Sequence, residues 1–179
     1  MSEIEVPHHA HTEEHKRIGI FVAVLAVIMA LISALAKNEA NQIIVKEVQA
    51  SNGFAWYQAK RQRSALNELE IRRAEFELAG SPTDAQRKVV EATRAKLNAK
   101  NAEYEKENEK ILEDAKAEKE AAQVAQHKHH RLEYAEICVQ IAVVLCSLTL
   151  LTDLKLFFHL GIVATVAGLL VAATTFWVR

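Results

Sequence analysis

The charged residues of this chain are concentrated in one central block. Residues 37–136 contain 18 of the 22 Lys and Arg residues and 18 of the 23 Asp and Glu residues. Apolar runs lie on both sides of this block. A water-soluble domain mixes apolar and polar residues at the period of a helix or strand, whereas separation into blocks is typical of membrane proteins. Since five Gly and two Pro are too few for a turn-rich β fold, the sequence predicts an all-α membrane protein.

Three apolar runs are candidates for transmembrane helices, and residues 1–17 before them form a polar N-terminal tail. Residues 18–36 contain no Asp, Glu, Lys or Arg and would span about 28 Å as a helix, close to the hydrocarbon thickness of a bilayer. Residues 137–152 form a shorter second span, and residues 156–178 form the third. Only residues 153–155 separate these two spans, so we expect them to form an antiparallel helical pair.

The first run is interpreted as a membrane anchor. The alternative is a cleaved signal peptide, because Ala34-Leu35-Ala36 resembles a cleavage site, but the run is long for a signal peptide. Three spans place the N-terminus and the 153–155 turn on one side of the membrane, and the charged block and Arg179 on the other. The distribution of Lys and Arg near the spans gives a small preference for a cytoplasmic charged block.

The predicted spans contain no Asp, Glu, Lys or Arg in their interiors, although proton and ion paths usually need such residues. Gln140, Ser147 and Thr149 are the main polar residues of the second span, and we interpret them as bonded to a neighbouring helix or to their own backbone. Small residues recur every four positions on two spans and predict close helix contacts, within one chain or between chains. They are Ala26, Ala30 and Ala34 on the first span, and Ala164, Gly168 and Ala172 on the third.

The charged block, residues 37–136, is predicted to form a long antiparallel helical hairpin with its turn near residues 80–82. Gly80 suits the left-handed position that follows a helix. Ser81 is a favourable N-cap, Pro82 fits the first position of the next helix, and Asp84 lies three residues after the cap. These stop and start signals are adjacent, so the chain is expected to turn sharply there.

Residues spaced by seven in both arms of the hairpin predict a coiled coil. The second arm provides Val90, Leu97, Tyr104 and Ile111, with Leu132 later in the series and Asn101, Asn108, Ala115 and Ala122 on the second flank. The first arm provides Val48, Ala55, Leu69 and Phe76, with Gln62 interrupting the series. Because these seams contain few large apolar residues, we expect the arms to pack on each other and on copies from other subunits.

No residue pattern in the chain points to catalysis or to a cofactor. A nucleophile elbow, a phosphate-binding glycine loop and a zinc-protease motif are all missing from the sequence. His127 and His130 share a helix face and are weak candidates for metal ligands, but a basic collar at the lipid headgroups explains the histidines near residue 130 more simply. A net charge of −1 gives no basic field for nucleic acid. We therefore expect no enzyme activity, no cofactor and no nucleic-acid partner.

Two short motifs carry a resemblance to a known family. Lys37-Asn38-Glu39-Ala40-Asn41 follows the first span, and Trp56-Tyr57-Gln58-Ala59-Lys60 lies further along the same arm. With one span before them and two after the hairpin, these motifs resemble the bacterial membrane family catalogued as domain of unknown function 4337. The resemblance implies a helical fold in the bacterial cytoplasmic membrane, and it implies no activity.

Trp56 and Tyr57 are large side chains on an otherwise charged helix, and each needs an apolar contact. They pack against the second arm, form a docking surface for another subunit or protein, or do both. The leading hypothesis for function is an oligomeric membrane scaffold, with membrane lipid and copies of the chain as partners. The alternative is an accessory or gating subunit of a membrane transport assembly, with an unidentified membrane protein as partner.

Overall fold

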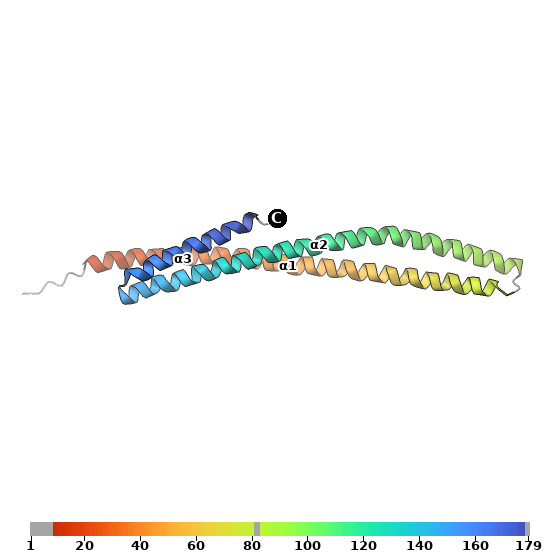
Figure 1. Cartoon of the computed structure of the whole chain (residues 1–179), viewed down its shortest axis with the longest axis horizontal. Helices are drawn as coiled ribbons and strands as arrows, with labels where there is room; N and C mark the ends of the chain where they lie inside the picture. Colours follow the sequence, from red (N-terminus) through yellow and green to blue (C-terminus); the bar gives the residue numbers. More distant parts are fainter. Residues whose placement is uncertain (1–8, 81–82, 178–179) are drawn as a thin grey trace, which may run out of the picture. The chain divides into compact units, whose positions relative to one another are not determined.

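The structure is a computed structural model that describes residues 9–80 and 83–177. Three long helices make up nearly all of the described chain: α1 (His9–Leu78), α2 (Asp84–Thr152) and α3 (Lys155–Thr174), followed by the short 3₁₀ helix η1 (Thr175–Trp177) (Figure 1). The described residues contain no strand, which confirms the all-α prediction. Each long helix contains a segment long and apolar enough to cross a membrane. Helix α1 begins within the predicted polar tail.

Internal contacts divide the chain into two units. We call the first the apolar unit; it comprises Met1–Ile43 and Gln123–Arg179. We call the second the charged unit; it comprises Ile44–Ala122. Helices α1 and α2 contribute residues to both units, and α3 belongs to the apolar unit alone.

The apolar unit has a core made by all three helices. Its buried members are Leu25, Ile32 and Ala36 of α1 and Leu132, Ala135, Val139, Ala142 and Cys146 of α2. Helix α3 packs on this core through Phe158, Ala164, Val171 and Ala172, and the rings of Phe21 and Phe158 meet edge to face at 5.7 Å. Leu132 and Ala135 precede the predicted second span, so helix packing in this unit extends beyond the uncharged segment.

A tight turn joins α2 to α3, as the near-absence of residues between the two spans predicts. Asp153 adopts a left-handed conformation with φ of 55°, a conformation that Asp tolerates better than most residues. Its carboxylate lies 2.8 Å from His15 Nε2 of α1, and the Lys155 ammonium donates to the Glu14 carboxylate at 2.9 Å. These polar contacts connect the beginning of α1 to the α2–α3 turn.

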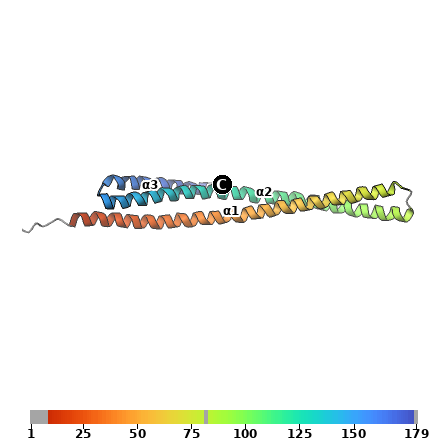
Figure 2. The same ribbon diagram turned by 90° about the horizontal axis from the view of Figure 1, so that it is seen from below.

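In the charged unit, α1 and α2 run antiparallel and side by side (Figures 1 and 2). The pairs Glu47–Lys119, Lys60–Glu107 and Glu75–Arg94 join the helices by ion pairs along the unit. Their residue numbers rise on α1 as they fall on α2, which fixes the antiparallel direction. Within the charged unit, α1 and α2 therefore form an antiparallel pair.

The start of α2 differs from the prediction. Thr83 is its N-cap: the Thr83 side-chain oxygen accepts from the Gln86 backbone N–H at 3.4 Å, and the Gln86 side chain accepts from the Thr83 backbone N–H at 2.8 Å. This reciprocal pattern is a capping box, and it makes Asp84 the first helical residue. Ser81 and Pro82, the predicted cap and first position, lie outside the described residues. Gly80 does not have a positive φ, so the predicted left-handed glycine is wrong.

Candidate interaction surfaces

The faces of α1 and α2 that meet in the charged unit repeat every seven residues. On α2, the predicted positions Val90, Leu97, Tyr104 and Ile111 all lie on this less exposed side. Asn108, Ala115 and Ala122 on its second flank are buried. The residues predicted for the seam of the second arm therefore lie on the less exposed side of α2.

The predicted register of the first arm is wrong. Val48, Ala55, Leu69 and Phe76 are all exposed, and Phe76 retains 82% of its accessible surface. The residues that face α2 instead alternate by three and four positions, and we call them the inner seam. They are Lys46, Ala50, Gly53, Tyr57, Lys60, Ser64, Asn67, Ile71, Ala74 and Leu78, none of which is exposed. Apart from Tyr57, Ile71 and Leu78, the residues that face the partner helix are therefore small or polar.

Small residues on the inner seam allow close approach of the two helices. A Cβ atom placed on Gly53 would lie 2.7 Å from Cβ of Ala115, and Ala50 is also buried. Elsewhere the seam is polar: the Asn67 amide donates to the Asn101 side-chain oxygen at 2.8 Å. Asn108 is buried, and its side-chain oxygen has no hydrogen-bond partner in the described part of the chain. The Asn67–Asn101 pair restricts register, because a shifted pairing would break this part-buried hydrogen bond.

Trp56 and Tyr57, the predicted interaction residues of the charged unit, lie on different faces of α1. Tyr57 is half-buried on the inner seam, and its hydroxyl accepts from the Arg61 guanidinium at 3.3 Å. This hydrogen bond raises the pKa of the Arg61 guanidinium. Trp56 is 60% exposed and lines a shallow hollow of about 310 Å³ with Gly53 and Ile111. Most of the indole ring is thus available to another molecule.

The two small-residue faces of the apolar unit are placed differently. On α3, Gly168 is buried and Ala164 and Ala172 are half-buried against the core. A Cβ atom on Gly168 would lie 3.0 Å from the Ala135 carbonyl oxygen, so this glycine permits close contact with α2. On α1, Ala26, Ala30 and Ala34 are all exposed. The α3 stripe is therefore used within the chain, and the α1 stripe is left on the surface of the unit.

The polar residues of the second span and the nearby histidines are bonded locally. Ser147 and Thr149 donate to backbone carbonyls of their own helix, at 2.8 and 3.2 Å, as the sequence analysis expected. His130 Nδ1 lies 3.1 Å from the Glu133 carboxylate, and His127 is exposed one turn earlier. Among the described residues, no group of three or more His, Cys, Asp or Glu side chains could hold a metal ion.

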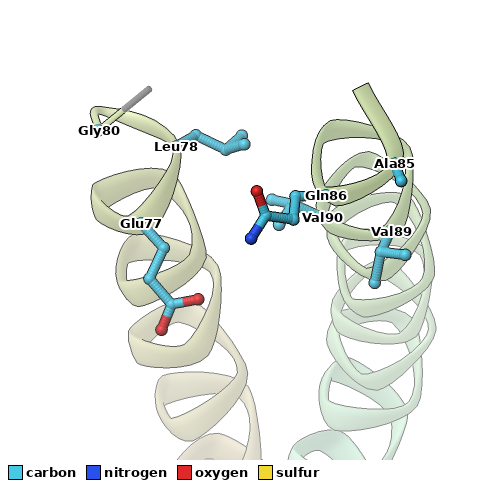
Figure 3. Close-up of a pocket in the computed structure, with 7 residues that line it drawn as sticks. All are labelled: Glu77, Leu78, Gly80, Ala85, Gln86, Val89 and Val90. Atoms are coloured by element: carbon cyan, nitrogen blue, oxygen red, sulfur yellow. The ribbon is translucent and has the colours of Figure 1, made fainter. Parts of the chain in front are cut away.

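A hollow of about 500 Å³ lies at the end of the charged unit, between the end of α1 and the start of α2 (Figure 3). Leu78 points from α1 toward Gln86 and Val90 of α2 (Figure 3), and Glu77 and Val89 also line the hollow. The Gln86 amide already completes the helix cap. The hollow has few convergent polar groups, and binding pockets for small molecules usually have several.

These features define the class of the protein: its described residues are helical, with three helices apolar enough to cross a membrane, two of which (α1 and α2) also form a charge-rich antiparallel pair. Within this class, the chain belongs to the family described as a domain of unknown function (DUF4337), whose model matches residues 14–178. No curated protein and no solved structure has significant similarity to the chain. The family match confirms the resemblance carried by the Lys37–Asn41 and Trp56–Lys60 motifs.

Proposed function

We propose that this chain is a non-enzymatic membrane scaffold that acts through protein–protein contacts. One observation carries the proposal: large apolar side chains are exposed along α1 in the charged unit. They are Ile44, Val45, Val48, Trp56, Leu66, Leu69 and Phe76. An apolar surface in a segment this rich in charge marks an interaction site, because exposing it to water is unfavourable. The three apolar helical segments supply the anchor in the lipid bilayer.

The proposal includes self-association. The exposed face with Ala26, Ala30 and Ala34 on α1 supports helix contacts between copies in the membrane, because small residues let backbones approach closely. The seven-residue burial period of the charged unit supports a left-handed coiled coil between its two helices. We place the chain in the bacterial cytoplasmic membrane with the charged unit in the cytoplasm, following the distribution of Lys and Arg.

The mass of the full chain in a native-like membrane environment tests the scaffold. The chain is extracted into lipid nanodiscs directly from its membrane and measured by native mass spectrometry. A defined homo-oligomer is expected, with or without further proteins bound. A monomer at every accessible concentration, with no bound protein, refutes the proposal.

Gln140 favours a second candidate, an accessory or gating subunit of a transport assembly. Its side chain is exposed in the predicted second span, and its only described contact is a 3.5 Å hydrogen bond to Glu136 on the same helix. A polar amide facing lipid is unfavourable and gains from a partner in the membrane. This candidate predicts that a channel or transporter co-purifies with the chain. Gln140→Leu should reduce the amount of that co-purified protein, whereas Ile141→Leu, at the neighbouring exposed position, should not.

A further inference from the structure

A second heptad seam runs along the exposed face of α1 in the charged unit. We call it the outer seam. Its residues are Val45, Val48, Asn52, Ala55, Ala59, Gln62, Leu66, Leu69, Arg73 and Phe76, and all ten are exposed. They alternate by three and four positions, as the inner seam does, but are shifted by two residues from it. Two positions correspond to about 200° around a helix, so the two seams lie on opposite sides of α1.

The outer seam has no counterpart on α2. Among the described residues of the charged unit, seven large apolar residues are exposed on α1, whereas α2 exposes only Val89, near its beginning. The exposed positions of α2 are instead occupied mainly by Lys, Glu and Ala. A partner for the charged unit therefore meets large apolar side chains mainly through α1.

The spacing of the outer seam identifies the geometry of its partner. A row of apolar residues repeating every seven positions packs against another helix with the same repeat. Only such a helix keeps its side chains aligned with the spaces between the side chains of the first helix over several turns. The inner seam of this chain is occupied by α2, and the outward face of α2 is charged. The surface of this protein that fits an outer seam is the outer seam of another copy.

We propose that α1 of one chain pairs with α1 of a second copy through the outer seams, as a parallel two-stranded coiled coil. This inference deepens the proposed function, since it takes the chain to be a membrane-anchored oligomer. Copies anchored in the same membrane with the same topology direct their α1 helices the same way, which makes the pairing parallel. Each outer-seam residue then lies opposite itself in the second copy.

The side chains of the outer seam fit a parallel pair. Leu66, Leu69 and Phe76 form apolar layers with their own counterparts. Asn52 occupies an a position, where a single buried Asn favours two parallel strands in register. Arg72 flanks the seam at a g position and faces Glu77 of the second copy, five residues further along, which is an opposite-charge contact. Arg73 opposes pairing because it meets itself in an a layer, although its guanidinium already contacts Glu77 of its own chain at 3.4 Å.

Cysteine cross-linking tests the pairing in the full chain in its membrane. Leu69→Cys places a thiol at a d position of the outer seam, where the two copies approach within the Cα separation of less than about 7 Å that a disulfide requires. Ala99→Cys, on an exposed position of α2, is the matched control. Both are made in a Cys138→Ala/Cys146→Ala background, so that the introduced thiol is the only one. Mild oxidation is expected to give a covalent dimer for Leu69→Cys and monomer for Ala99→Cys.

A second variant tests the energetics of the same surface. Leu69→Glu places two carboxylates in one layer and is expected to raise the dissociation constant by about tenfold or more in nanodisc titrations, whereas Ala99→Glu leaves it unchanged. If native mass spectrometry finds an oligomer but Leu69→Cys does not cross-link and Leu69→Glu has no effect, the outer-seam pairing is wrong and the scaffold proposal stands. If the chain is monomeric throughout, both are wrong.

Discussion

Replacing Gly53 with alanine tests how closely the two helices of the charged unit approach. Two effects oppose each other at this position. Alanine stabilises a helix interior by about 0.8–1 kcal/mol relative to glycine. The added Cβ, however, would lie only 2.7 Å from Cβ of Ala115 and 3.4 Å from its Cα. Because one of these neighbours is backbone, the helices must move apart, and overpacking of this kind costs about 1–3 kcal/mol. We therefore expect Gly53→Ala to destabilise the unit by about 0–2 kcal/mol.

The double variant Gly53→Ala/Ala115→Gly provides the decisive comparison. It moves the methyl group from one helix to the other, so the helix-propensity terms cancel and the contact is restored. The single variant Ala115→Gly loses about 1 kcal/mol of propensity together with a buried methyl contact. We expect the double variant to be more stable than the sum of the single effects by about 1–3 kcal/mol, the coupling energy of residues in direct contact.

Urea unfolding of the full chain in mild detergent, followed by circular dichroism at the helical band, measures these free energies. Urea acts mainly on the water-exposed charged unit, since detergent protects the apolar helices. If Gly53→Ala stabilises the chain by the full propensity term and the two substitutions are additive, the helices do not approach at this point. The explanation of the small residues on the inner seam is then refuted.

Three further predictions concern single contacts. Thr83→Ala removes the α2 cap and should destabilise the charged unit by about 1 kcal/mol in the same urea assay, and an unchanged midpoint would contradict the cap. Asn67→Leu should cost about 1–2 kcal/mol by leaving the Asn101 side-chain oxygen without its 2.8 Å donor, whereas Asn67→Leu/Asn101→Leu should recover most of that loss. Gly168→Val should lower thermal stability in detergent by about 1–3 kcal/mol. Ala167→Val, at an exposed position, should change it by less than about 0.5 kcal/mol. Equal effects of the two substitutions would exclude close α2–α3 packing.

Much of the fold follows from the segregation of charge in the sequence. Long uncharged runs, and a charged block in which Gly and Pro come together only near residues 80–82, leave little besides long helices. The two-residue connection at Asp153–Leu154 requires an antiparallel pair. The less exposed side of the second arm was also predictable, because Val90, Leu97, Tyr104 and Ile111 repeat at sevens and most other positions of that arm are charged, polar or Ala. One apolar series on a helix leaves no ambiguity about the face that is buried.

The first arm was mispredicted because α1 carries two series at sevens. The series with larger apolar residues, Val48, Leu69 and Phe76, was predicted to face α2, since the hydrophobic effect favours their burial. The structure instead buries the series that contains Ala50 and Gly53. Periodicity alone cannot rank two such series, because the choice depends on how well each complements the opposite helix. The buried Ala115 and the partly buried Asn101 on α2 select small and amide-bearing partners.

The contrast between the two seams of α1 has a thermodynamic reason. The inner seam pairs segments of one chain, and their connection near residue 80 keeps them at a high effective concentration. Weak packing through Ala50, Gly53 and Asn67 is then sufficient, and the amides restrict its register. Association of two separate copies must instead overcome an estimated 4–15 kcal/mol of lost translational and rotational freedom, less where a membrane already orients them. Large apolar residues supply more free energy per layer, so placing Leu66, Leu69 and Phe76 on the outer seam suits pairing between chains better than pairing within one.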